Sequence, residues 1–252
     1  MRYISPSLLK EYLFCPRSFL YRKIHRLNLI PLMNMNFFAQ KRVMEFTSGF
    51  FLQLKEQWIE KGNLETQLDL EFLLSSKYNS YLEIRATTQD QTFRELDEKI
   101  FTLLSWLIVY LWGEPTLNTE QHPILPFMVN ELIRAPSINL QGRPSAVFKH
   151  PNGSVLILIQ AYGLISPYVQ RWATLHAVLY ARILETMGIR ANCFLYVNYY
   201  SMNLIFQELK NTDFRNFDRF LKDFRIAIKE ENFDPLDNPP CDICEFQWIC
   251  NN

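Results

Sequence analysis

The first half of the chain carries apolar residues at helical spacing. Residues 5–13 begin with Ser5 and Pro6 and then place apolar side chains three and four positions apart, which predicts a helix capped at Ser5. The same spacing runs through residues 37–58 and 93–112, and the Gly-Glu-Pro sequence at 113–115 ends this block. We expect residues 37–123 to form a helical insertion packed on the domain that follows.

Past Pro123 the apolar runs become short and typical of strands. Residues 127–133, 141–149 and 154–162 predict three strands, and Asn152-Gly153 predicts a hairpin turn between the last two. The last of these strands is apolar on both faces at residues 155–159, so we expect it at the centre of its sheet.

The remainder of the chain alternates helix and strand. No glycine-rich phosphate loop opens a helix, so the order does not predict a Rossmann unit. We expect an α/β core over residues 124–230, in one domain spanning residues 1–252. The expected elements are a helix at 168–187 closed by Gly188, strands at 191–199 and 202–209, and a helix at 214–230.

Composition narrows the class of protein. The 252 residues are 48% hydrophobic, which is enough to bury a large core, and no repeat points to a solenoid. The formal net charge is zero, so any contact with DNA needs a local basic surface. The most apolar run, residues 100–112, is shorter than the about 20 residues that span a bilayer. We expect a soluble protein that does not act at a membrane.

A local basic segment does follow the first helix. Its cations alternate with Phe19, Leu20 and Tyr21, which suits a helix with one apolar stripe and one cationic face. That face either binds phosphate groups or is simply solvated. The candidate phosphate ligands in it are Arg17, Arg22, Lys23 and Arg26, with His25 among them.

Cysteine spacing is the strongest chemical signal. Two residues separate Cys241 from Cys244, and five separate Cys244 from Cys250. This spacing lets three thiolates bind one metal centre. Cys15, at the other end of the chain, is the candidate fourth ligand, and zinc fits the spacing as well as an iron–sulfur cluster does. No signal peptide is apparent, so we expect a reducing cytoplasmic setting that disfavours disulfides, with inert thiols as the alternative. Cys193 lies in an apolar run and is predicted to be a core residue.

Several motifs together resemble a known family. They are the Ser-Pro-Ser…Cys-Pro-Arg sequence at 5–17, the Gly-Arg-Pro-Ser-Ala-Val sequence at 142–147, the Leu-Tyr-Ala sequence at 179–181 and the cysteines of the tail at 231–252. This set resembles the RecB-like PD-(D/E)XK nucleases that hold a four-cysteine iron–sulfur cluster. The CRISPR-associated exonucleases of the adaptation machinery are similar in size, and AddB-type nucleases share the cysteine arrangement. The resemblance implies a restriction-endonuclease-like mixed sheet flanked by helices and a 4Fe–4S cluster.

The catalytic positions of that family are altered in this chain. The resemblance implies an aspartate where Ser145 stands, and an acid and a lysine where Gln160 and Tyr162 stand. The helix glutamine of the family corresponds to His176, and the early-helix histidine corresponds loosely to Met44. Neutral ligands cannot offset the cost of dehydrating Mg²⁺, so we expect no conventional metal-dependent cleavage, and no catalytic Mg²⁺ or Mn²⁺.

Relocated carboxylates are the alternative to an inactive site. Glu131 and Glu185 are the nearest acids that could replace the missing ones. His176 is more typical of a packing residue than of a metal ligand or general base, and His25, His122 and His150 share no ligand spacing.

Three functions follow from this reading. The first is an inactive nuclease-fold iron–sulfur protein that binds single-stranded DNA or a protein subunit, within CRISPR adaptation or a related DNA-processing complex in antiviral defence. Its expected DNA contacts are Arg17, Arg22, Lys23 and Arg26, with Arg143 and Arg171 beside the former active site. The second is an active exonuclease with relocated carboxylates, and the third is a scaffold that packs on another subunit without touching DNA.

Overall fold

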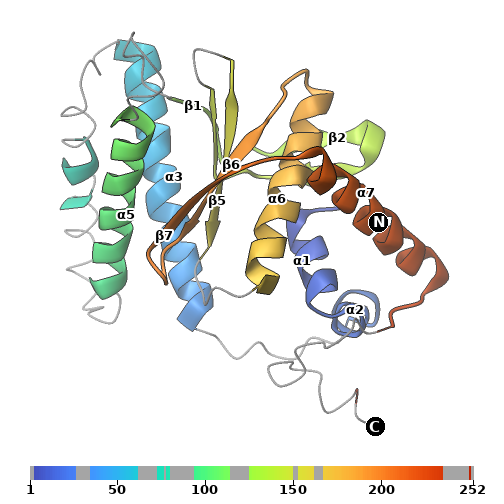
Figure 1. The fold of residues 1–252 in the computed structure, drawn as a ribbon. Helices are drawn as coiled ribbons and strands as arrows, with labels where there is room; N and C mark the ends of the chain where they lie inside the picture. The colour runs from blue at the N-terminus through green and yellow to red at the C-terminus, as the bar shows by residue number, and fades with distance from the viewer. Residues whose placement is uncertain are drawn as a thin grey trace.

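The fold is a five-stranded mixed sheet between two layers of helices (Figure 1). A computed structural model of the chain describes residues 3–26, 35–61, 73–76, 78–79, 94–113, 125–149, 153–161, 167–234 and 250. In Figure 1, α3 (Met35–Lys61) and α5 (Arg94–Gly113) lie on one side of the sheet, and α1 (Pro6–Phe14), α6 (Pro167–Thr186) and α7 (Asn211–Glu230) lie on the other.

The sheet has the order β1-β4-β5-β6-β7. Its pairs are antiparallel except β5 with β6, which run parallel because α6 crosses over between them. The strands are β1 (Leu125–Val129), β4 (Ala146–Lys149), β5 (Val155–Ala161), β6 (Cys193–Asn198) and β7 (Asn203–Glu208). The prediction that the apolar run at 155–159 is central is confirmed, because β5 is the third of the five strands.

The two expected strands at 127–133 and 141–149 are each divided in two, which corrects the sequence prediction. After β1 the chain turns at Asn130, whose φ is 49°, and leaves the sheet to form a separate pair, β2 (Ile133–Ala135) with β3 (Leu140–Gly142). A single 3₁₀ turn, η4 (Pro136–Ile138), joins this pair and ends at Asn139, also at positive φ. Asparagine tolerates this conformation, so the two turns interrupt runs that hydrophobicity alone makes continuous.

Each face of the sheet supplies alternate residues to a separate core. On β5, Val155, Ile157 and Ile159 pack with α1, α6 and α7, whereas Leu156 and Leu158 pack with α3 and α5. This follows from the strand period of two, which sends successive side chains to opposite faces. Burial on both faces explains why β5 is a continuous apolar run.

The helices match the expected segments closely, and two local details set their ends. Ser5 precedes α1 in an extended conformation with Pro6 in the first turn, as predicted, and Gly188 follows α6 at a φ of 76°. By contrast, α7 begins at Asn211 rather than 214, because the Asp213 carboxylate accepts a hydrogen bond from the Lys210 amide at 2.9 Å. This capping interaction adds a first turn that the apolar pattern does not reveal.

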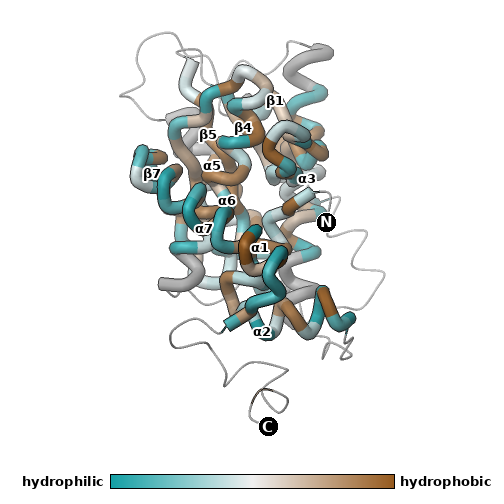
Figure 2. The backbone as a smooth tube through the Cα atoms, turned by 90° about the vertical axis from the view of Figure 1, so that its right-hand side faces the viewer, coloured by the Kyte–Doolittle hydropathy of each residue, from teal (hydrophilic) through white to brown (hydrophobic). Residues whose placement is uncertain are grey.

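The helix α7 shows how the outer layer meets solvent. Its buried residues, Phe217, Leu221, Phe224 and Ala227, are three or four positions apart and form one stripe. Most of the rest of the helix is polar, the exceptions being Phe214, Phe220, Ile226 and Ile228, and Figure 2 shows α7 in mainly hydrophilic colours. None of the helices within the described residues has the length and apolar character needed to cross a membrane.

Candidate functional site

The basic segment begins at Cys15, where the first helix breaks. Cys15 is buried and extended between α1 and α2 (Pro16–Phe19), with a φ of −165°, and its amide donates to the Glu11 carbonyl at 3.1 Å. The π-helical turn η1 (Leu20–Ile24) continues from α2 and carries the next cations. The break at Cys15-Pro16 places the thiol at a corner of the chain.

Tyr21 brings sulfur atoms from both ends of the chain into one neighbourhood. Burial raises the pKa of the Tyr21 phenol, and so do its electrostatic and hydrogen-bond interactions with Cys250 and the proximity of Cys15. Arg17 opposes these effects and lowers the pKa. The hydrogen bond therefore joins the phenol to a residue at the far end of the sequence, and that residue, Cys250, is half-buried.

This arrangement is compatible with the predicted metal centre that joins the two ends of the chain. Two soft thiol donors, one buried and one half-buried, share a single aromatic neighbour, which is what a thiolate site joining the two ends requires. Cys241 and Cys244 lie outside the described residues, as does any site that includes them. Within the described residues no group of three or more histidine, cysteine or acidic side chains gathers to hold a metal. Cys193 is 7% exposed in the core, as predicted.

At the other predicted site, Gln160 is held in a network of neutral groups. It lies near the carboxyl end of β5 and pairs in register with Val197 of β6. Its Oε1 is 2.9 Å from the Thr47 hydroxyl of α3, and its Nε2 is 3.3 Å from the hydroxyl of Tyr199, which follows β6 directly. Burial raises the pKa of Tyr199, so this phenol stays neutral.

The Thr47 hydroxyl limits how this network is wired. It also lies 2.7 Å from the Val43 carbonyl, and one hydrogen cannot fully serve both acceptors. Exchanging the oxygen and nitrogen of the Gln160 amide, which have nearly the same shape, lets Thr47 donate to Val43 and accept from Gln160. In either orientation Gln160 is a neutral amide whose hydrogen-bond partners lie inside the protein.

The other altered positions do not all gather around Gln160. Met44 is one turn before Thr47, and its carbonyl oxygen lies 3.5 Å from the Thr47 hydroxyl. Ser145 directly precedes Ala146, which pairs with Leu158 at the same end of the sheet. Tyr162 lies outside the described residues.

His176 lies on the opposite face of the sheet from Gln160. Its ring stacks between Trp172 and Tyr180 along α6, with ring centroids 4.8 and 4.7 Å away, and α6 packs against α1. Burial lowers the pKa of His176 to about 3, with help from the positive charge of Lys10. Although the residue as a whole is half-buried, its Nε2 is sealed from solvent without a hydrogen-bond partner. A neutral packing histidine, as expected, describes it better than a general base.

The two candidate replacement carboxylates lie at different ends of the sheet. Glu131 follows β1 at the end where Val129 pairs with Ala146, and its carboxylate is 2.8 Å from Lys55 of α3. Glu185 pairs with Arg182 at 2.9 Å, near the beginning of β6, so it lies across the sheet from Gln160. Only Glu131 shares the end of the sheet with Ser145 and Gln160.

The predicted DNA-contacting cations form two groups. Arg22, Lys23 and Arg26 are exposed and Arg17 is half-buried, and Lys23 is 3.2 Å from the Glu11 carboxylate. Arg171 lines a cavity of about 540 Å³ with Tyr12 and Leu13, at the end of α1 that leads into this segment.

Arg143 lies at the other end of α1 from Arg171. Its carbonyl accepts a hydrogen bond from the Tyr180 hydroxyl at 2.7 Å. Tyr180 and Arg171 are nine residues apart on α6, about 13 Å along the helix. Arg171 therefore extends the basic segment, whereas Arg143 does not.

The sequence reading missed three residues of these sites: Tyr21, Thr47 and Tyr199. Tyr199 stands at the carboxyl end of a strand parallel to β5, where functional groups of α/β sheets gather, and this rule could have singled it out. Thr47 follows the assigned Met44 by one helical step of three residues, and Tyr21 follows Cys15 by six. Of the predicted histidines, His25 is exposed, whereas His122 and His150 lie outside the described residues.

Comparison with known proteins leaves the family open. No protein-family model matches the chain, and no curated protein matches it. Among solved structures, the chain is similar to a candidate exonuclease from Eubacterium rectale, at 11% identity and a TM-score of 0.46 over 96% of this chain and 87% of that one. It is also similar to the protein SSO0001, at 12% identity and a TM-score of 0.41 over 99% and 85%. These similarities are too low to carry a statement about activity.

Proposed function

We propose that this chain is a nuclease-fold protein that does not cleave DNA, binds single-stranded DNA along its basic segment, and has its two ends joined by a metal centre bound to cysteine thiolates. The setting we propose is a DNA-processing complex, such as CRISPR adaptation, in which a protein subunit is the further partner. The motif resemblance and the mixed sheet between helical layers support the nuclease fold.

The Gln160 network carries the proposal of inactivity. A divalent cation that cleaves phosphodiesters needs anionic oxygen ligands to compensate for lost hydration. At the position of the third-strand acid this chain has an amide that is hydrogen-bonded to Thr47 and Tyr199. An amide in this role stabilises the joint between α3 and the sheet and offers no charge to a metal.

The thiolate centre would be structural. Cys15, Cys241, Cys244 and Cys250 would hold it, and an iron–sulfur cluster or zinc there would supply a covalent link between distant ends of the chain. The electrostatic influence of both Cys15 and Cys250 on the pKa of Tyr21 supports this, because it places both residues in the neighbourhood of one side chain. The link would also fix the cations that follow Cys15.

The residues that follow Cys15 support DNA binding. Exposed Arg22 and Arg26 lie on the segment that follows Cys15, and Tyr21 directly precedes Arg22, so cations for phosphate contacts and an aromatic ring for stacking lie in one segment. Arg171 lines the neighbouring cavity and would add one more cation to this group.

The metal centre is tested on the full chain purified without oxygen. We expect visible absorption with bound iron and sulfide, lost in Cys15→Ser and Cys250→Ser and kept in the matched variant Cys193→Ser. Four-thiolate zinc would give a colourless protein with about one bound zinc. A protein with neither metal would contradict this part of the proposal.

Cleavage and binding are tested on the same preparation. We expect no Mg²⁺- or Mn²⁺-dependent release of nucleotides, and binding of a short single strand that weakens with salt and falls in Arg22→Gln/Arg26→Gln but not in Lys229→Gln. Cleavage abolished by Glu131→Gln would favour the relocated active site, because Glu131 lies at the same end of the sheet as Gln160. Absence of salt-dependent binding would favour the scaffold.

A further inference from the structure

A second charged site lies at the end of the sheet opposite Gln160. The α6–α7 cavity, of about 650 Å³, opens where α6 ends, β6 begins and α7 begins. Its polar lining consists of Arg182, Glu185, Arg190, Asn192, Asn211 and Arg215. Three arginines against one glutamate leave a formal charge of +2 in the lining, in a chain whose net charge is zero.

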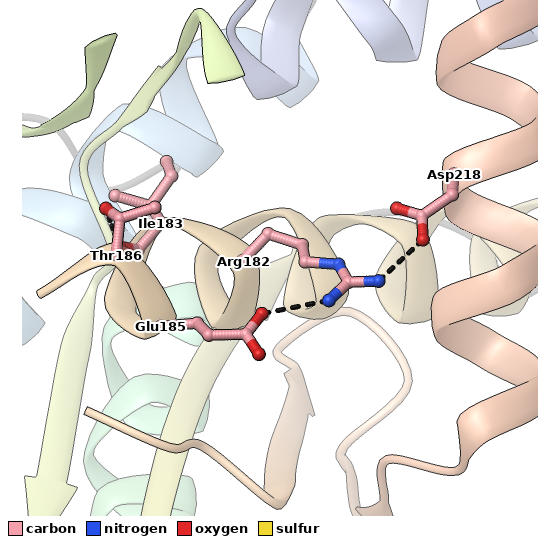
Figure 3. A network of polar contacts seen from close by, with 5 residues as sticks. All are labelled: Arg182, Ile183, Glu185, Thr186 and Asp218. Atoms are coloured by element: carbon pink, nitrogen blue, oxygen red, sulfur yellow. Dashed lines mark hydrogen bonds and ion pairs between the residues drawn. The ribbon is translucent and has the colours of Figure 1, made fainter. Parts of the chain in front are cut away.

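Arg182, one of the lining residues, is held by two carboxylates (Figure 3). It donates to Glu185 at 2.9 Å and to Asp218 of α7 at 2.5 Å, and its guanidinium lies 4.9 Å from the centre of the Phe214 ring. The negative charges of these two carboxylates balance the positive charge of Arg182 and raise its pKa. The two contacts hold the guanidinium in place, and it forms a fixed wall that joins α6 to α7.

The charge available to a ligand comes from Arg190 and Arg215. Both side chains are exposed and line the cavity, and neither has an ion-pair partner among the residues that the structure describes. Arg190 comes from the turn after α6 and Arg215 from the first turns of α7, so the two guanidinium groups belong to different walls of one cavity. A single anion between them would satisfy both.

Two neutral features favour the same kind of ligand. The Asn192 Oδ1 accepts the Val155 amide at 3.2 Å, which leaves the Asn192 amino group as the end available to the cavity. The apolar part of the lining, Ala181, Ala191, Leu209 and Phe214, can cover the uncharged part of a bound molecule.

From this combination we infer that the α6–α7 cavity binds the terminal phosphate group of a nucleotide-sized molecule, held by Arg190, Arg215 and Asn192 against the wall made by Arg182. A volume of about 650 Å³ falls within the range of small-molecule sites. The phosphate can belong to a free nucleotide or to the 5′ end of a DNA strand. The site is separate from the basic segment near Cys15 and does not depend on that segment binding DNA.

Calorimetry on the full chain with pyrophosphate, ATP and a 5′-phosphorylated oligonucleotide tests this site. We expect pyrophosphate and ATP to bind, and Arg190→Gln and Arg215→Gln each to weaken binding about tenfold, as loss of one charge-assisted hydrogen bond does. Lys229→Gln removes a cation from the far end of α7 and should leave the affinity unchanged. Thermal unfolding of each variant without ligand verifies that it is folded.

The outcomes separate the ligand sources and the alternatives. If the oligonucleotide binds in a manner that needs both its 5′ phosphate and Arg190, a DNA end is the ligand, whereas binding of ATP alone identifies a free nucleotide. No binding of pyrophosphate or ATP at millimolar concentration overturns the inference. So does equal weakening in Lys229→Gln, which would mean diffuse attraction rather than a site. Substitutions at Arg22 and Arg26 should leave the binding of pyrophosphate and ATP unchanged, and should not alter how far oligonucleotide binding depends on the 5′ phosphate.

Discussion

The two helical layers are each joined by an arginine–carboxylate bridge, but burial makes the bridges unequal. On one face of the sheet, Arg42 of α3 binds Asp97 of α5 through contacts of 2.7 and 2.5 Å, with both side chains at most 4% exposed. On the other face, Arg182 of α6 binds Asp218 of α7 at 2.5 Å, with the side chains 28% and 51% exposed.

The difference teaches that contact distance alone does not rank these interactions. A buried charge that loses its partner has no water to replace it, whereas an exposed charge regains hydration. Each face also has an uncharged polar group next to its helical layer: Gln160 lies beneath α3 and His176 lies beneath α1. Four substitutions test how far burial, rather than geometry, sets the cost.

The largest effect is expected for Asp97→Ala. It leaves the Arg42 guanidinium buried without its carboxylate, and we expect the free energy of unfolding to fall by about 3–5 kcal/mol. Urea unfolding measures this. Glu95→Ala is the matched control, because Glu95 pairs with Lys99 on the exposed side of the same helix and its loss should change stability little. Equal effects of the two substitutions would contradict the role assigned to burial.

His176 should make stability depend on pH. Its pKa is about 3 in the folded protein and 6.5 in an exposed histidine, so below pH 6.5 the unfolded chain takes up a proton that the folded chain does not. Stability is therefore lost as pH falls from 6.5 toward 3, by about 1.4 kcal/mol per pH unit, or about 2 kcal/mol at pH 5. His176→Phe keeps a ring between Trp172 and Tyr180 and should remove this component. If the free energy of unfolding depended on pH in the same way for this variant and for the natural chain, the role assigned to His176 would be refuted.

Gln160→Met should have a smaller effect. The substitution leaves the hydroxyls of Thr47 and Tyr199 without their shared partner, and we expect a loss of about 1–2 kcal/mol in chemical denaturation. The double variant Thr47→Val/Gln160→Met removes one of the two hydroxyls that lost this partner and should recover part of the loss. A double variant as unstable as the sum of the two single ones would show that the groups are not coupled.

Asp218→Asn should have the smallest effect, below about 1 kcal/mol, because the bridge to Arg182 is solvated and Glu185 still holds the guanidinium. The difference from the natural chain should shrink further at high salt, when measured by thermal unfolding. A loss as large as that of Asp97→Ala would mean that the α6–α7 bridge determines stability despite its exposure.

The fold was predictable wherever one face of an element is buried. The helices at 37–58, 93–112 and 168–187 and the central strand at 155–159 all appear at the expected places, because burial imposes a period of 3.6 or 2 on the sequence. The exceptions are local. The turns at Asn130 and Asn139 and the Lys210–Asp213 cap depend on single polar residues, which leave no period to detect.

The sites were predictable only in their residue types. Cys250 stands out by its spacing from Cys241 and Cys244, yet its hydrogen bond to Tyr21, near the other end of the chain, depends on how the chain ends fold back. Gln160 and His176 look equivalent as altered catalytic positions, but the strand and helix that carry them direct these side chains to opposite faces of the sheet.

Sequence alone determined the main helices and the central place of β5 in the sheet, because both depend on spacing along the chain. The tertiary structure decided which polar groups share an environment: Gln160 with Thr47 and Tyr199, and Arg190 with Arg215 across one cavity. Burial and proximity between distant residues set hydrogen bonding, charge and pKa, and no local pattern encodes them.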